Sequence, residues 1–316
     1  MPDSSDLPRA GVSAEENTSG SVLSAGERLL LTDRKGRMYV IELEDGGQFH
    51  SHTGIVDHAA IVAAGEGGRV RTTGNAEYTI LRPTLSDFVV KMPRGAQVIY
   101  PKDLGTILML ADVYPGARVF ESGVGSGALS MTLLRAGAVV TGYEIREDFA
   151  NRAQSNVEEF LGAEAFSRYT VKMQSAYDPI DEVGFDRFIL DLPEPWQVVP
   201  HAKVSLRPGG ILVAYTPSVT QVMQLHDALR HAGFTSIETI EVLHRGWHID
   251  GRAVRPDHRM VAHTAFLTSA RLLTDTPATM PPARVVESET EFDSEVESEV
   301  ESESKSEAKS SNLDPA

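Results

Sequence analysis

The chain has 316 residues, no cysteine and a formal net charge of −16 at pH 7. This length suits one large domain or two smaller ones, and the lack of cysteine excludes disulfides, thiolate chemistry and cysteine-ligated zinc. No apolar run approaches the roughly 18 residues of a membrane span, and no charged-then-apolar leader opens the chain. We therefore expect a cytoplasmic protein with no membrane partner and no metal site.

The negative charge is concentrated near the carboxyl end. Residues 274–316 hold 12 acidic and 3 basic residues, and 287–307 is a Ser/Glu-rich repeat almost without large apolar side chains. Such a segment cannot bury enough apolar surface to offset the entropy lost on ordering. We predict that residues 1–23 and 274–316 are disordered. The acidic tail is interpreted as a solubilising extension, with an interaction tail as the alternative.

Residues 24–91 have the pattern of a small β domain. Short alternating runs at 28–32, 38–43, 69–72 and 78–81 are broken by glycine-containing turns. This pattern predicts short strands that form a small sheet or partial barrel. Residues 92–104 then read as a linker that enters a helix over 104–113.

A glycine-rich stretch follows the first strong apolar strand. Val119 and Phe120 precede Glu121, glycines then alternate at positions 123, 125 and 127, and a helix is predicted from there. A strand, a tight glycine turn and a helix bring backbone close to an adenosine-bearing ligand. The Glu-x-Gly-x-Gly-x-Gly spacing favours S-adenosylmethionine over a dinucleotide, which uses Gly-x-Gly-x-x-Gly. An ordinary tight turn is the alternative.

A second acid stands where a ribose ligand is expected. Residues 137–144 read as the next strand and end in Glu144, 17 residues after Gly127. Ligands in open α/β sheets lie off the carboxyl ends of the strands, where a carboxylate can accept hydrogen bonds from ribose hydroxyls. The alternative is a solvated acid at a strand end.

Strands and helices alternate over residues 92–273. Strands are predicted near 118–122, 138–144, 168–174, 185–191, 210–215, 236–243 and 260–269, and helices near 104–113, 127–135, 147–161, 196–206 and 219–232. Alternation predicts an α/β, Rossmann-like, largely parallel sheet with helices on both faces. The last two strands have only a loop between them, so at least one should be antiparallel. This pattern suits the seven-stranded sheet of S-adenosylmethionine-dependent methyltransferases, here preceded by the small β domain.

Two further segments carry candidate functional residues. The strand 185–191 ends in Asp191, and Pro193 and Pro195 then fix the backbone, which makes a rigid platform for catalytic groups. An ordinary strand-to-helix connection is the alternative. Residues 244–259 gather seven His and Arg residues around Trp247. This window is either a nucleic-acid contact or a polar loop between two strands.

Six motifs occur in the order known from one family. They are Ile99-Tyr-Pro-Lys-Asp103, Glu121-x-Gly-x-Gly-Ser-Gly127, Tyr143-Glu144, Asp191-Leu-x-Glu-Pro-Trp196, Tyr215-x-Pro-x-x-Thr-Gln221 and His263-Thr-Ala-Phe-Leu267. Together they resemble the bacterial and archaeal tRNA (adenine-58-N1)-methyltransferases over about residues 25–270, and the Asp191–Trp196 element is the most specific. The resemblance implies a homotetramer that forms 1-methyladenosine at position 58 of the tRNA T-loop. The acidic tail has no counterpart in the family core.

The resemblance also implies roles for individual residues. S-adenosylmethionine would be bound by Gln97, Glu121, Ser122, Gly123, Val124, Gly125, Ser126, Gly127, Glu144, Ser175 and Asp191. Asp191 and Tyr100 would be the catalytic residues, and Tyr100, Tyr215 and His263 would shape the base pocket. Gln97, Ser175 and His263 have structural alternatives as ordinary polar groups. Arg252 and Arg255, in the basic window, are the candidates for contact with the tRNA backbone.

The chemistry of adenine agrees with an aspartate in this role. Adenine N1 is a neutral nitrogen with a lone pair, so the enzyme mostly supplies position, and Asp191 would orient the base through its exocyclic amine. The rivals are a protein-carboxylate or small-molecule methyltransferase on the same fold, and a non-catalytic RNA-binding subunit. The intact acids and glycines disfavour the second rival.

Overall fold

The computed structural model describes residues 22–92, 95 and 97–274. The predicted disordered segments 1–23 and 274–316 lie outside the described residues, except for residues 22, 23 and 274. Leu23 is 3% exposed and belongs to the apolar cluster of the amino-terminal strands, so packed structure begins at least one residue before the predicted boundary.

The amino-terminal region is built on a four-stranded antiparallel sheet in the order β2-β1-β6-β5. Alternate residues of β1 and β6, such as Leu29, Leu31, Tyr78 and Ile80, point into a common core, as the period of two predicts. A second hairpin, β3–β4, and the helix α1 complete this region. The elements are β1 (Arg28–Asp33), β2 (Met38–Glu42), β3 (Gln48–Ser51), β4 (Gly54–Asp57), α1 (His58–Ala64), β5 (Arg69–Arg71) and β6 (Glu77–Leu81).

Helix α2 (Leu85–Lys91) was not predicted. It begins with a capping box in which the Thr84 hydroxyl accepts from the backbone N–H of Asp87, while the Asp87 carboxylate accepts from the backbone N–H of Thr84. This local signal was present in the sequence.

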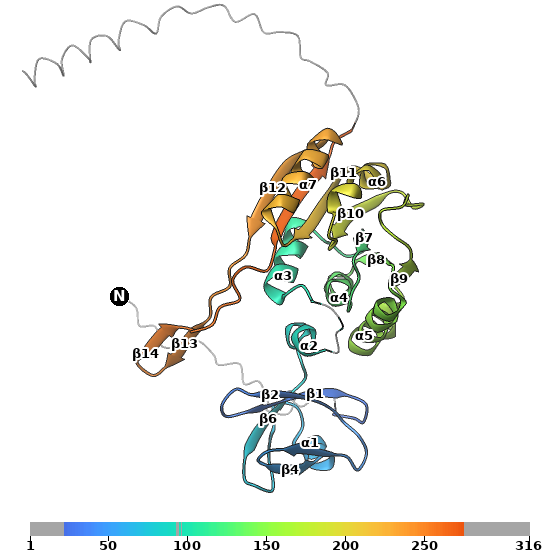
Figure 1. The fold of residues 1–316 in the computed structure, drawn as a ribbon. Helices are drawn as coiled ribbons and strands as arrows, with labels where there is room; N and C mark the ends of the chain where they lie inside the picture. Colours follow the sequence, from blue (N-terminus) through green and yellow to red (C-terminus); the bar gives the residue numbers. More distant parts are fainter. Residues whose placement is uncertain (1–21, 93–94, 96, 275–316) are drawn as a thin grey trace, which may run out of the picture. The chain divides into compact units, whose positions relative to one another are not determined.

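A seven-stranded sheet in the order β12-β15-β11-β10-β7-β8-β9 forms the larger part of the structure (Figure 1). The five strands from β11 to β9 in this order are parallel, and β15 pairs antiparallel with both β11 and β12, which confirms the predicted fold class. The last strand spans 266–272 rather than 260–269. The strands are β7 (Arg118–Ser122), β8 (Val139–Glu144), β9 (Tyr169–Met173), β10 (Phe185–Leu190), β11 (Leu206–Thr216), β12 (Phe234–Glu241) and β15 (Phe266–Leu272).

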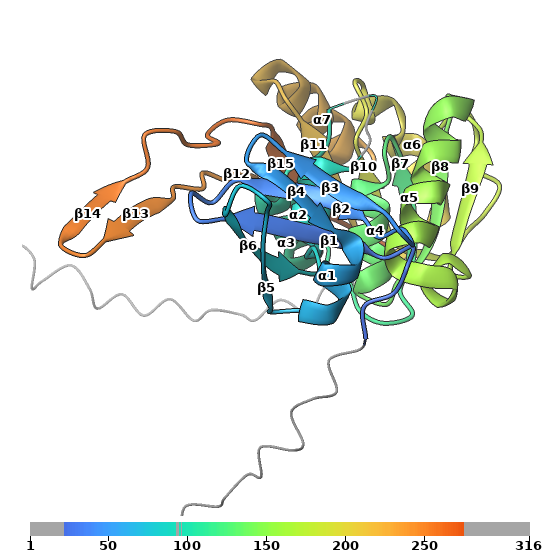
Figure 2. The ribbon, with the colours of Figure 1, turned by 90° about the horizontal axis from the view of Figure 1, so that it is seen from below.

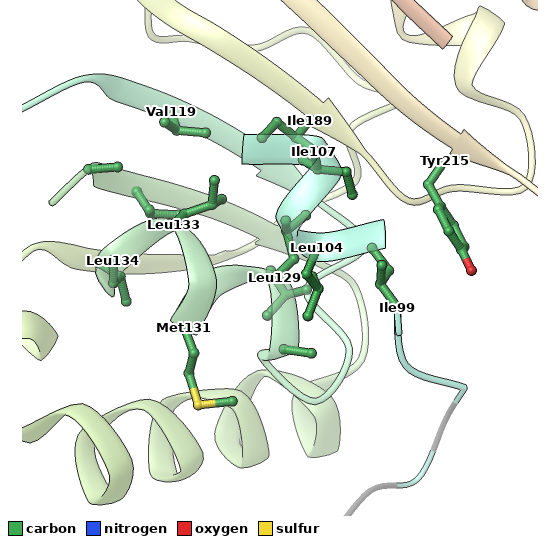
Figure 3. Close-up of a cluster of buried hydrophobic side chains, with 14 of the residues drawn as sticks. Ile99, Leu104, Ile107, Val119, Leu129, Met131, Leu133, Leu134, Ile189 and Tyr215 are labelled. Carbon is green, nitrogen blue, oxygen red and sulfur yellow. The ribbon is translucent and has the colours of Figure 1, made fainter. Parts of the chain in front are cut away.

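Helices cover both faces of this sheet (Figures 1 and 2). Adjacent residues of one strand therefore enter different cores: Val119 of β7 belongs to the cluster that includes residues of α3 and α4, whereas Phe120 belongs to the cluster that includes residues of α6 and α7. Figure 3 shows the first core, where Ile107, Leu133 and Ile189 meet. Burial on both faces explains the nearly continuous apolar strands. The helices are α3 (Pro101–Leu110), α4 (Ala128–Arg135), α5 (Glu147–Phe166), the short 3₁₀ turn η1 (Pro195–Gln197), α6 (Val199–Ser205) and α7 (Val219–His231).

The loop predicted between the last two strands contains a β-hairpin. Strands β13 (Trp247–Asp250) and β14 (Ala253–Pro256) pair antiparallel at the end of two connections that leave the large sheet (Figures 1 and 2). The basic window is therefore neither a plain loop nor part of the seven-stranded sheet.

Candidate active site

The glycine-rich turn and Asp191 are in direct contact. Strands β7 and β10 are parallel neighbours with Ser122 opposite Leu190, so the residues that follow them meet at the carboxyl edge of the sheet. The backbone N–H of Asp191 donates to the carbonyl of Ser122 at 2.9 Å. Gly123 has φ +83°, and a Cβ there would lie 2.0 Å from the Asp191 carbonyl oxygen. Only glycine fits this position.

Glu144 is fixed beside the same turn. Its Oε2 accepts from the backbone N–H of Gly125 at 3.1 Å, and its Oε1 accepts from the N–H groups of Ile145 and Arg146 at 2.9 and 3.0 Å. An ionised carboxylate accepts roughly four hydrogen bonds, so these three leave capacity for at least one further donor, such as a ribose hydroxyl. The carboxyl end of β8 thus holds Glu144 where the sequence predicted it.

Glu121 is a fully buried carboxyl group with an unsatisfied oxygen. Its Oε2 accepts from the Ser130 hydroxyl at 2.7 Å, and Ser130 also contacts the Tyr169 hydroxyl at 2.9 Å. Its Oε1 has no hydrogen-bond partner among the described residues. Burial raises the pKa of Glu121 to about 8, because the charged form is poorly solvated there.

The turn fits a ligand that has both a ribose and a cationic group. Ser126 Oγ, like Glu121 Oε1, is buried and has no partner within the described part of the chain. Unsatisfied buried polar atoms are rare in proteins and are explained when a ligand supplies their partners. An ammonium group suits Glu121, and a ribose hydroxyl suits Glu144. S-adenosylmethionine carries both groups.

A cavity of about 530 Å³ brings together most of the predicted catalytic and substrate-binding residues. They come from four separate parts of the chain: the segment before α3, the end of β10, the end of β11 and the segment before β15. Figure 3 shows Tyr215 with its hydroxyl directed away from the apolar core. The predicted site residues that line this cavity are Gln97, Tyr100, Asp191, Tyr215 and His263.

Two ionisable groups of this cavity have raised pKa values. Burial raises the pKa of Asp191 to about 7, although part of the residue remains accessible, and no described residue donates a hydrogen bond to its carboxylate. Burial likewise raises the pKa of Tyr215 to about 12, so its phenol is neutral at physiological pH. Asp191 therefore changes charge near neutrality and has its acceptor capacity free for a ligand.

A buried polar cluster beside the cavity was not predicted. The ammonium of Lys102 donates to Asp103 Oδ1 at 2.8 Å, to the Val242 carbonyl at 2.7 Å and to Thr264 Oγ1 at 2.7 Å. The Thr264 hydroxyl donates to Asp103 Oδ2 at 2.8 Å, and Asp103 is 0% exposed. This cluster fixes the start of α3, next to Tyr100, against the segment that carries His263. Its members Lys102, Asp103 and Thr264 lie in two of the quoted motifs, but nothing in either motif indicates that they meet.

His263 is held by two acceptors. Its Nε2 lies 3.0 Å from the Pro217 carbonyl and its Nδ1 lies 2.7 Å from Glu241 Oε1. Both partners favour the doubly protonated ring, and they raise the pKa of His263. With both ring nitrogens occupied, His263 contributes to the wall of the cavity rather than offering a free acid or base.

Three of the predicted site residues belong neither to the glycine turn with its carboxylates nor to the lining of the cavity. Ser175 follows β9 at the carboxyl edge of the sheet, where its hydroxyl accepts from the backbone N–H of Tyr177. Arg252 and Arg255 lie on the β13–β14 hairpin. The cross-strand pair His248–Arg255 gives one face of that hairpin its basic groups, whereas the pairs Trp247–Pro256 and Ile249–Val254 make the other face apolar.

Within residues 22–92, 95 and 97–274, no cluster of three or more His, Asp or Glu side chains has the arrangement to hold a metal ion. No helix of this described part is long and apolar enough to cross a membrane.

Comparison with solved structures defines the class of protein. The chain is 33% identical to a SAM-dependent O-methyltransferase from Thermotoga maritima, with a TM-score of 0.77 over 81% of this chain and 97% of that one. It is 27% identical to the tRNA (m1A58) methyltransferase TrmI from Aquifex aeolicus, with a TM-score of 0.71 over 80% of this chain and 99% of that one. The fold is that of the S-adenosylmethionine-dependent methyltransferases.

Sequence comparison narrows the class to one family. Residues 78–265, more than half of the chain, match the model described as tRNA methyltransferase complex GCD14 subunit, and residues 22–70 match the TrmI-like N-terminal model. The chain belongs to this tRNA methyltransferase family. It is 40% identical to the tRNA (adenine(58)-N(1))-methyltransferase TrmI of Thermus thermophilus, over 77% of this chain and 96% of that protein. It is 33% identical to the tRNA (adenine(57)-N(1)/adenine(58)-N(1))-methyltransferase TrmI of Methanocaldococcus jannaschii, over 77% of this chain and 94% of that protein.

Proposed function

We propose that this chain is an S-adenosylmethionine-dependent tRNA methyltransferase that forms 1-methyladenosine at position 58 of the T-loop. The observation that carries the proposal is the contact between the glycine turn and Asp191, because Asp191 also lines the cavity with Tyr100 and Tyr215. One carboxylate thus borders both a cofactor-like site and a separate cavity. The names of the family relatives support tRNA as the acceptor.

The residues of the turn have definite roles in this proposal. Glu144 accepts a ribose hydroxyl, and Glu121 Oε1 accepts the ammonium of the methionine moiety. Gln97, the residues 122–127 and Ser175 complete the wall. Bound S-adenosylmethionine supplies an electrophilic methyl group on a sulfonium centre. The chain itself supplies the position and the electrostatic environment.

Asp191 is the residue we assign to the reaction. Its free carboxylate accepts a hydrogen bond from the exocyclic amine of adenine and holds the ring in register for attack by N1. The same interaction raises electron density at N1 and stabilises the positive charge that methylation leaves on the base. Since burial raises the pKa of Asp191 to about 7, this acceptor is fully ionised only on the alkaline side of neutrality.

The tyrosines provide a binding place for an extruded base. Removing a base from its stack costs a few kcal/mol, and stacking on an aromatic ring returns about 1–3 kcal/mol. Tyr100 is the N-cap residue of α3, and Pro101 follows it at the first helical position. The backbone is therefore fixed directly after Tyr100. Tyr215 is 9% exposed, and its neutral phenol serves as a hydrogen-bond donor or acceptor toward the base.

The proposal also covers the tRNA contact outside the active site and the oligomeric state. Arg252 and Arg255 on the hairpin are assigned to the tRNA backbone, and a homotetramer in the cytoplasm is expected from the family resemblance and the cysteine-free chain. The name of the Methanocaldococcus jannaschii relative also raises methylation at position 57 as a second product to look for.

The decisive experiment compares acceptors. Purified protein is incubated with methyl-labelled S-adenosylmethionine and two unmodified transcripts that differ only in adenosine or guanosine at position 58. The proposal predicts label on the adenosine transcript alone, recovered as 1-methyladenosine after nuclease digestion. Label on neither transcript, with cofactor binding intact, contradicts it and favours a protein-carboxylate or small-molecule acceptor.

A further inference from the structure

A basic surface lies on the amino-terminal sheet, in a chain whose net charge is −16. We call it the Glu77 patch. It consists of the β1–β2 turn, the edge strand β5 and the start of β6, and its charged members are Asp33, Arg34, Lys35, Arg37, Arg69, Arg71 and Glu77. The sheet order places β5 beside β6 and β6 beside β1, so these segments meet at one end of the sheet.

Three arginines of the patch converge on one carboxylate. Arg71 and Arg34 lie 3.1 and 3.3 Å from the oxygens of Glu77, and Arg69 lies at 3.6 Å. Burial opposes ionisation of Glu77, but the arginines more than compensate and hold its pKa below the usual value. The side chain of Glu77 is 15% exposed, whereas those of Arg34 and Arg69 are 74% and 70% exposed. The acid is covered, and the guanidinium groups face solvent.

The cations of the patch outnumber its acids. Arg37 pairs with Asp33 at 2.6 Å, and the Lys35 ammonium makes no ion pair among the described residues. Five basic groups against two acids leave three positive charges in excess, next to a cavity of about 330 Å³. Cavity walls that combine guanidinium groups, an ammonium and polar side chains such as His52, Thr53 and Asn75 are suited to phosphate oxygens.

We propose that the Glu77 patch binds the phosphodiester backbone of the tRNA substrate, as a contact surface separate from the active site. This inference rests on the proposed function for the identity of the nucleic acid. The patch reads no base sequence, because solvent-facing guanidinium and ammonium groups at the end of a sheet recognise phosphate charge rather than base edges.

Protection of a sheet edge is the competing explanation for two of these residues. Charged side chains on an edge strand such as β5 discourage pairing with another chain. That explanation accounts for Arg69 and Arg71, but not for Arg34 and Lys35 in the β1–β2 turn. The turn residues therefore separate the two explanations.

The test uses the full chain with Arg34→Gln/Lys35→Gln. Both residues lie in an exposed turn, and Glu77 keeps Arg69 and Arg71 as partners, so the fold should be retained. The matched control is Arg230→Gln/Arg271→Gln, which changes the net charge equally on α7 and β15. The dissociation constant for the adenosine-58 transcript is measured from 50 to 200 mM KCl, together with kcat and KM for methylation.

The expected result is a weaker salt dependence only in the patch variant. Loss of two phosphate contacts lowers the slope of log K against log salt by about 1.4 to 1.8, since each contact contributes roughly 0.7 to 0.9. KM for tRNA should rise about tenfold, the control should match the wild type, and kcat and cofactor affinity should be retained. Equal behaviour of patch variant and control, whether both change or neither does, overturns the proposal. If the wild-type protein binds tRNA but does not methylate it, the proposed function is contradicted. The proposal for the patch is still tested in that case, because the salt dependence of binding is measured without methylation.

Discussion

Replacing Glu121 by glutamine should change how stability depends on pH. In the folded protein burial raises the pKa of Glu121 to about 8, from an ordinary value of 4.5. Between these values the unfolded chain releases its proton and the folded chain keeps it, so the free energy of unfolding falls as pH rises. Each pKa unit corresponds to about 1.36 kcal/mol, and the loss between pH 5 and pH 8 comes to about 3 kcal/mol. Glutamine does not titrate, and its amide oxygen can still accept from Ser130.

The assay is urea unfolding of the wild type and Glu121→Gln at pH 5, 6, 7 and 8. The difference in unfolding free energy should shift by about 3 kcal/mol in favour of the variant across this range. Glu182→Gln is a suitable control, because hydrogen bonds from Lys172 and Tyr143 outweigh its partial burial and lower the pKa of Glu182. Its effect should stay nearly constant above pH 5. A Glu121→Gln difference that is also constant would show that Glu121 is ionised in the folded protein and refute the reasoning.

The same group should link cofactor binding to proton release. A cationic ligand near Glu121 favours its charged form, so at pH 7 binding should expel up to about 0.9 proton from a group with a pKa near 8. Calorimetry of S-adenosylmethionine binding in phosphate and Tris buffers measures this release. Glu121→Gln should release correspondingly less, and equal release by both proteins would remove Glu121 from the cofactor site.

Three further predictions concern the geometry around the cavity. Gly123→Ala should abolish cofactor binding. The control is Gly116→Ala: Gly116 has a similar φ of +85°, but a Cβ there would have nothing within 4 Å, so this variant should lose only about 1–2 kcal/mol of stability. Equal effects of the two substitutions would argue against the close approach of Gly123 to Asp191. Asp103→Asn should lower the free energy of unfolding in urea by about 3–5 kcal/mol, because it leaves the buried ammonium of Lys102 without its carboxylate. An unchanged free energy of unfolding would contradict the buried ion pair. The kcat/KM of methylation should rise through pH 7 as Asp191 ionises and level off above pH 8. A kcat/KM that stays constant from pH 6 to 8 would show that this ionisation does not limit the reaction.

The arrangement of the glycine turn and its carboxylates could be predicted because its signals are local. Glu121 and the alternating glycines lie within seven residues, and Glu144 ends the next strand. Once the strands are parallel, their carboxyl ends must meet at one edge, and Asp191 follows from the same rule. The quoted motifs also placed Tyr100 and Tyr215 on one list of pocket residues, and both line the cavity.

The clearest feature that the sequence could not predict depends on contacts that no local pattern encodes. The Lys102–Asp103–Thr264 cluster joins residues more than 160 positions apart, so only the folded chain brings them together. The β13–β14 hairpin did carry a local signal, because Trp247 and Ile249 alternate with polar residues before the turn at Gly251, but its strands have only four residues each. Short strands of this kind read as a loop. Helix α2 is a different case, because its capping box was visible and was overlooked.

The most direct measurement is single-turnover methylation of the adenosine-58 transcript by the wild type and by Asp191→Ala, at saturating cofactor and tRNA. Asp178→Ala, an exposed aspartate in the loop between β9 and β10, serves as the matched control. We predict 1-methyladenosine from the wild type and the control, and a rate about 10²–10³-fold lower for Asp191→Ala with cofactor affinity nearly unchanged. Near-normal turnover by Asp191→Ala would contradict the assignment of this carboxylate to the adenine.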